Sequence, residues 1–136
     1  MADPRELSLE QIEGRAWGDA PADAGTLVNT VHRLRRKPVE TLDAEDLRVL
    51  IAQRVGLPVL IPRALDLLEN DPLAEGAYYP GDVLTAVLRT PAEFWATRPS
   101  ETARLRALLA SVDTSDIDEE LRQDIASFQQ GPTNRR

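Results

Sequence analysis

Hydrophobic residues recur every three or four positions along much of this chain, the spacing that places them on one face of an α-helix. The clearest run is Leu27, Val28, Val31 and Leu34, and its helix must end before Pro38. Similar runs follow as far as residue 128. The pattern predicts an all-α fold, a compact single-domain bundle of about seven or eight short helices. We expect the domain to cover residues 1–130 and the tail 131–136 to be disordered.

Capping residues and prolines predict where the helices begin and end. The first helix is expected to end at Gly14, and an ordered loop is expected over Arg15–Gly25. Asp43 has the further signature of a hydrophobic staple. Near Pro58 we expect a separate helical turn, followed by a helix over about Pro62–Asn70, because proline is tolerated best in a first turn. Polar side chains are expected to cap five helices: Ser8, Asp43, Thr90, Ser100 and Ser115.

Composition excludes several chemical classes. The 136 residues include no cysteine and one histidine, so thiol catalysis, iron–sulfur clusters, disulfide scaffolds and the usual zinc sites are excluded. We therefore expect neither a metal nor a cofactor. The N-terminus lacks the pattern of a secretory signal, and no stretch approaches the span of a bilayer. We expect a soluble, cytoplasmic protein that does not bind membranes.

Charge indicates the kind of partner. A formal net charge of −7 disfavours direct binding to nucleic acid and favours a basic protein partner. Between Ala64 and Leu88 the sequence has five carboxylates and no Lys or Arg, which predicts a surface of one sign. Two tyrosines lie within this stretch, and tyrosine is enriched at protein interfaces. The candidate binding residues are Glu69, Asp71, Glu75, Tyr78, Tyr79 and Asp82. Solvated carboxylates and one buried tyrosine would explain the same pattern without a partner.

Other polar features have structural interpretations. The acidic stretch Asp113–Asp124 suits the positive end of a helix, and the basic run His32–Lys37 suits a helix C-terminus. His32 itself is interpreted as a packed or capping residue. Trp17 and Trp95 are interpreted as core or lid residues. No Walker loop, dinucleotide fingerprint, paired-histidine motif or serine elbow is present, so we do not expect an enzyme.

Several segments, in order, carry a family resemblance. They are LSLEQIEG, AWG, LVNTVHRLRRKPVETLDAEDLRVLIAQRVGLPVLIPRAL, DPLAEGAYYPGDVL and EFW, between about Leu7 and Trp95. Across this span the chain resembles a group of bacterial contact-dependent growth inhibition (CDI) immunity proteins. The resemblance implies an all-helical cytoplasmic protein that neutralises the C-terminal toxin domain of a cognate effector, without catalysis or cofactor.

The charge pattern and the resemblance lead to one mechanism. An acidic, tyrosine-containing face would bind a basic toxin, and if that toxin is a nuclease the carboxylates would mimic phosphate in its groove. We expect a monomer that forms a 1:1 complex, because the core assignment leaves no exposed apolar stripe. Two alternatives remain open: a helical adaptor for another cytoplasmic protein, and a small hydrolase that uses His32 with Glu75 or Asp82.

Overall fold

The computed structural model describes residues 6–115 and 117–130, and within them the chain forms eight α-helices and one 3₁₀-helix without a strand. The expected all-α fold is therefore confirmed. The disorder expected for residues 131–136 lies outside the described residues. The helices are α1 (Leu9–Glu13), α2 (Thr26–Arg35), η2 (Val39–Thr41), α3 (Ala44–Ala52), α4 (Leu57–Asn70), α5 (Asp82–Leu88), α6 (Ala92–Ala96), α7 (Pro99–Ser111) and α8 (Glu119–Gln130).

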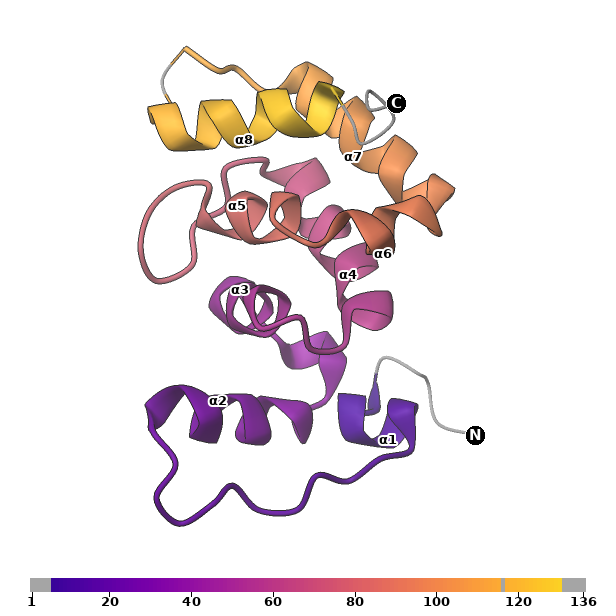
Figure 1. Ribbon diagram of the computed structural model, residues 1–136, viewed down its shortest axis with the longest axis vertical. Helices are drawn as coiled ribbons and strands as arrows, with labels where there is room; N and C mark the ends of the chain where they lie inside the picture. Colours follow the sequence, from indigo (N-terminus) through magenta and orange to yellow (C-terminus); the bar gives the residue numbers. More distant parts are fainter. Residues whose placement is uncertain (1–5, 116, 131–136) are drawn as a thin grey trace.

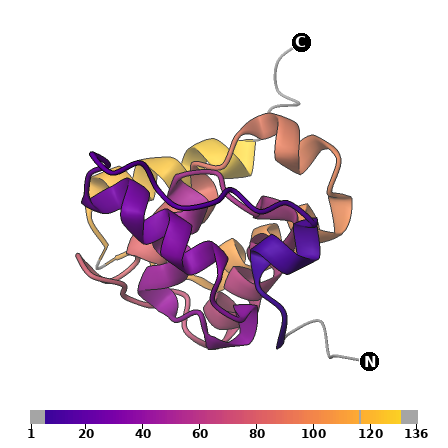
Figure 2. The same ribbon diagram turned by 90° about the horizontal axis from the view of Figure 1, so that it is seen from below.

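The helices stack along the long axis of the molecule (Figure 1). α1 and α2 lie at one end, α3 lies between α2 and α5, and α7 and α8 lie at the other end. The loop that joins α4 to α5 projects from one side, at the left of Figure 1. Seen from below, the loop between α1 and α2 runs alongside α2 (Figure 2). In Figure 1, α3 lies between the α4–α5 loop and the N-terminal end of α2, which is its outer end.

One apolar core runs through the stack. α5 is buried along its whole length because α3, α4 and α8 all pack against it. Trp95 is 6% exposed, so its assignment to the core is confirmed. The fully buried leucines come from six helices, which ties both ends of the stack to one core: Leu9, Leu34, Leu50, Leu60, Leu65, Leu68, Leu84 and Leu105.

Two of the five expected N-caps are confirmed. The Ser8 hydroxyl accepts a hydrogen bond from the Gln11 N–H at 3.2 Å, and the Gln11 side chain accepts one from the Ser8 N–H. α1 ends at Gly14, whose φ of 69° is left-handed, as expected for a glycine at this position. The Asp43 carboxylate caps α3 through the Asp46 N–H at 2.8 Å, and Asp46 reciprocates.

The other three caps were predicted wrongly. Thr90 is buried and its hydroxyl donates to the Ala86 carbonyl instead of capping α6. α7 begins at Pro99, before Ser100 could cap it. Ser115 donates to Asp113, whereas the Asp118 carboxylate accepts the Leu121 N–H at the start of α8. Thr90 and Ser115 thus have other hydrogen-bond partners, which sequence spacing alone does not reveal.

The break expected before Pro62 was also wrong. α4 continues through Pro58 and Pro62 from Leu57 to Asn70. A proline inside a helix removes one backbone hydrogen bond, which usually bends or ends the helix. Here the helix buries a continuous face on both sides of that position, with Leu60 and Ile61 before it and Ala64 after it. This packing outweighs the lost bond.

Apolar side chains remain exposed at the outer end of α2. Leu27 is 48% exposed and Val28 is 43% exposed. Trp17, which lines the same hollow, is 44% exposed. Trp17 is therefore a lid residue and not a core residue. The premise that no apolar stripe would remain exposed is wrong, because α2 has only α3 as a substantial helical neighbour.

Candidate functional site

Residues 74–81 form the part of the α4–α5 connection next to α5, which we call the tyrosine loop. Its shape is set by the first residue of α5, Asp82, which is 3% exposed. The Asp82 carboxylate accepts backbone N–H bonds from Gly76 at 2.6 Å, Tyr78 at 3.0 Å and Tyr79 at 3.4 Å. One buried carboxylate thus folds the loop back onto α5, and the Asp82 side chain faces the loop instead of solvent.

Helix α3 supports the same loop from the other side. The Glu45 carboxylate accepts the Ala77 N–H at 2.8 Å and two Arg48 N–H bonds at 2.6 Å each. The hydrogen bonds from Arg48 lower the pKa of Glu45, and burial opposes this shift. The Arg48 guanidinium also lies 4.6 Å from the centre of the Tyr78 ring. Sequence reasoning missed Glu45 and Arg48, because they lie about thirty residues before the loop and no spacing rule links them to it.

The two tyrosines differ in exposure. Tyr78 is 71% exposed, with its backbone held by Asp82 and its ring stacked under Arg48. Tyr79 is 37% exposed, and its hydroxyl donates to Thr85 at 3.2 Å. Both line a hollow of about 370 Å³ between α3 and α5, called the tyrosine hollow. The hollow is also lined by three arginines: Arg48, Arg54 and Arg89.

The expected surface of one sign is wrong in three dimensions. Arg104, from α7, donates to both Asp66 and Glu69 of α4, at 2.7 and 2.8 Å. This hydrogen bonding lowers the pKa of Glu69. Asp71 and Glu75 are exposed, and they form no ion pair with any described residue. The exposed negative charge at the tyrosine loop therefore comes mainly from Asp71 and Glu75, with Glu69 partly neutralised.

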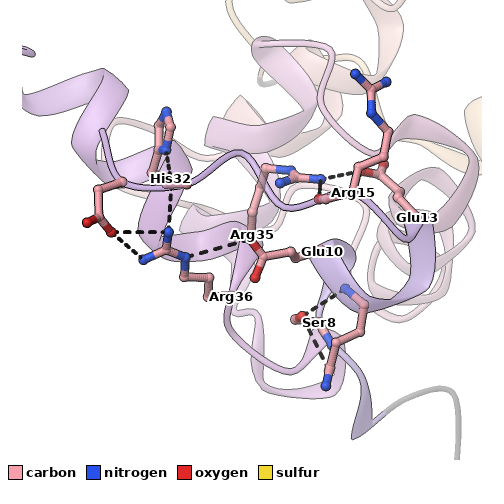
Figure 3. Close-up of polar contacts among 10 residues, drawn as sticks. Ser8, Glu10, Glu13, Arg15, His32, Arg35 and Arg36 are labelled. Atoms are coloured by element: carbon pink, nitrogen blue, oxygen red, sulfur yellow. Dashed lines mark hydrogen bonds and ion pairs between the residues drawn. The ribbon is translucent and has the colours of Figure 1, made fainter. Parts of the chain in front are cut away.

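The basic run at the end of α2 has a structural role, as expected. Arg35 is 1% exposed and donates to Glu13 at 2.6 Å and to the Arg15 carbonyl at 3.1 Å (Figure 3). Arg36 donates to the Gly18 carbonyl at 2.6 Å. His32 packs edge-on against Trp17, and its Nδ1 lies 3.2 Å from the Gly18 oxygen. These contacts fasten the α1–α2 loop to α2.

A catalytic pairing of His32 with Glu75 or Asp82 is not assembled. His32 lines a hollow with Trp17, whereas Asp82 lines the separate tyrosine hollow. Among residues 6–115 and 117–130, no group of three or more His, Asp or Glu side chains could hold a metal ion. Nor is any helix in these ranges long and apolar enough to cross a membrane. What the site presents is a rigid exposed aromatic side chain beside unpaired carboxylates, an arrangement suited to binding protein.

The fold is that of a small all-helical protein. A family model described as CDI immunity proteins matches residues 11–105, more than half of the chain. The chain belongs to this family, whose members confer immunity against a CDI toxin. A search of curated protein sequences returns no match.

Proposed function

We propose that this protein binds the C-terminal toxin domain of its cognate CDI effector through the tyrosine loop and its flanking carboxylates. The observation that carries the proposal is Tyr78, which is 71% exposed although its backbone and ring are both held in place. A fixed exposed aromatic side chain loses little entropy on binding, which is why such residues anchor interfaces. In this proposal Tyr78 and Tyr79 are the anchors.

The exposed carboxylates supply attraction to a basic toxin. Asp71 directly follows α4, Glu75 lies four residues further along in the tyrosine loop, and Glu69 lies in the last turn of α4. Charges at the rim of an interface chiefly accelerate association and lose effect as salt rises. The proposed partner is therefore a toxin with a cationic face, bound as a 1:1 complex without nucleic acid. A nuclease fits this description, because its phosphate-binding groove is cationic.

Asp82 has a different role from the other candidate residues in this proposal. Its carboxylate is engaged by three backbone N–H groups and is buried, so it positions Tyr78 and Tyr79 instead of contacting the toxin. A charge reversal at Asp82 would disrupt the loop as a whole. Glu75 is the better position for a test of contact charge, because its side chain is exposed.

The experiment compares paired variants for binding to the C-terminal toxin domain of the cognate CDI effector. Tyr78→Ala should weaken binding by about 2 kcal/mol or more if the ring is an anchor. Glu75→Lys should slow association, whereas Glu93→Lys makes the same charge change at an exposed site on α6 and should not. Growth of cells that co-express toxin and variant gives a second measurement. Equal effects of the two charge reversals, with unchanged binding by Tyr78→Ala, would disprove the proposed surface.

A further inference from the structure

A second surface, on the other side of α3 from the tyrosine loop, has the composition of an interface centre. It consists of Trp17, Leu27 and Val28, and we call it the apolar patch. Together with Val31, His32, Gln53 and Val55 these residues line a hollow of about 200 Å³. No Asp, Glu, Lys or Arg lines this hollow. Depletion of charge combined with an exposed aromatic side chain is typical of the buried centre of a protein interface.

The contact that holds Trp17 in its exposed position reduces the stability of the fold. The guanidinium of Arg35 lies 4.0 Å from the centre of the Trp17 ring and is buried beneath it. Its Nε and Nη1 atoms have no hydrogen-bond partner among the described residues. A buried polar group without a partner destabilises a fold. This cost is explained if an immobile, outward-facing tryptophan serves binding, since a preorganised side chain loses little entropy in a complex.

The apolar patch and the tyrosine hollow are neighbours across the C-terminal end of α3. At the C-terminal end of α3, alternate residues line the two hollows: Gln53 and Val55 line the apolar one, and Ala52 and Arg54 line the other. Figure 1 accordingly shows the outer end of α2, α3 and the tyrosine loop in succession along one side. An interface of ordinary size covers about 800 Å² of each partner, which is wide enough to span neighbouring helices.

We infer that the toxin domain bound at the tyrosine loop also covers the apolar patch, with an apolar segment that lies beside its cationic face. This inference rests on the proposed function and adds a second contact to it. A second copy of this chain is the other candidate occupant. It would carry the same net charge of −7, and like charge opposes self-association, whereas a cationic toxin is attracted.

The two surfaces then make separable contributions. Rim carboxylates set the rate of association, and the apolar patch sets the rate of dissociation, because a desolvated contact must be broken before the partners separate. Leu27→Asp tests this division. Leu27 is the second residue of α2, where an aspartate suits the positive helix end, so the fold is retained. The added negative charge would favour a cationic toxin, so weaker binding would reflect the lost apolar contact.

The experiment measures association and dissociation rates of the toxin domain, purified from the co-expressed complex, on immobilised wild type and variants. Leu27→Asp and Trp17→Ala should each raise the dissociation rate about tenfold or more and change association less than about threefold. The matched control is Ile12→Asp, which adds the same charge at a 36% exposed apolar residue on α1. Both of its rates should equal those of wild type. Circular dichroism confirms that each variant is folded.

Distinct results would overturn the inference and the proposed function. If Glu75→Lys and Tyr78→Ala weaken binding but Leu27→Asp and Trp17→Ala do not, the patch lies outside the interface and the proposed function stands. If wild type does not bind the toxin domain, or no tyrosine-loop variant changes binding, the proposed function fails. If wild type dimerises in sedimentation and Leu27→Asp is monomeric, a second copy occupies the patch and the inference is wrong.

Discussion

The carboxylate of Asp82 lies 2.6 Å from the backbone nitrogen of Gly76, across the base of the tyrosine loop. Because the same carboxylate accepts the N–H groups of Tyr78 and Tyr79, one side chain replaces the pairing that regular secondary structure would provide for this loop. The exposed tyrosines of an otherwise irregular segment are therefore held by the buried first residue of α5. Order in this part of the surface depends on the charge of that residue.

Replacement of Asp82 by Asn should destabilise the protein. The amide keeps the size of the side chain but loses the charge-assisted hydrogen bonds and places donor hydrogens opposite backbone N–H groups. We expect the free energy of unfolding in urea to fall by about 1–3 kcal/mol. Asp71→Asn, at an exposed carboxylate without an ion pair to any described residue, is the matched control and should change it little. Equal stability of both variants would contradict the role given to Asp82.

Substitutions at two glycines should distinguish the destabilisation caused by backbone strain from that caused by steric overlap. Gly56 and Gly14 have nearly the same left-handed φ, 67° and 69°. A Cβ at Gly56 would lie 2.7 Å from a methyl carbon of Leu9, whereas a Cβ at Gly14 meets nothing within 4 Å. Gly14→Ala should cost about 1 kcal/mol of unfolding free energy from the backbone alone. Gly56→Ala should cost about 2 kcal/mol more, because α1 must shift away from α4. Thermal unfolding measures both, and similar losses would show that Leu9 adjusts freely.

Stability should depend on pH through Glu45. Hydrogen bonds from Arg48 hold the pKa of Glu45 below its ordinary 4.5 in the folded protein, so the unfolded chain binds this proton more tightly. The stabilisation is therefore complete above pH 4.5 and disappears as the pH falls through the lowered pKa. Glu45→Gln should lower the urea midpoint near pH 7, and its difference from wild type should shrink on acidification. A difference that stays constant down to about pH 3 would contradict this linkage.

Removal of Arg104 should make the face of α4 more attractive to a cationic toxin. Arg104→Gln frees Asp66 and Glu69 from their ion pairs, and we expect association about twofold to threefold faster at low salt. Arg106→Gln removes the same charge from α7, at an exposed arginine that forms no ion pair with any described residue. It should change association less, if Glu69 lies near the contact. An equal increase in both variants would mean that only net charge matters.

Much of the fold could be predicted from the sequence, because its signals are local. Ser8, Gly14 and Asp43 act through residues within one helical turn, so spacing reveals them. Pro62 could not be interpreted in this way, since the packing that keeps α4 intact comes from other helices. Thr90 failed for a related reason, since it is buried and its hydroxyl donates to Ala86. Ser115 failed because α8 begins only at Glu119, and its hydroxyl donates to nearby Asp113.

For the candidate site, the sequence identified the exposed tyrosines and carboxylates but not their surroundings. It assigned Asp82 to the same surface as Glu75, although one is buried and the other exposed. The position of Asp82 in the chain did not indicate that its side chain is buried. The carboxylate accepts hydrogen bonds from an irregular loop, and no sequence pattern specifies such partners. The exposed apolar patch was also missed, since helical spacing alone cannot show whether a neighbour covers a given face.

The sequence by itself determined the helical class, the family and the excess of negative charge, because composition, periodicity and ordered motifs are properties of the chain. Tertiary structure decided which charges remain unpaired. Arg104 of α7 neutralises Asp66 and Glu69 of α4, and Arg35 is buried beneath Trp17. Arg48 of α3 lies 3.9 Å from Asp82 of α5. Electrostatic and packing energies depend on distance in space, and only the packed helices set those distances.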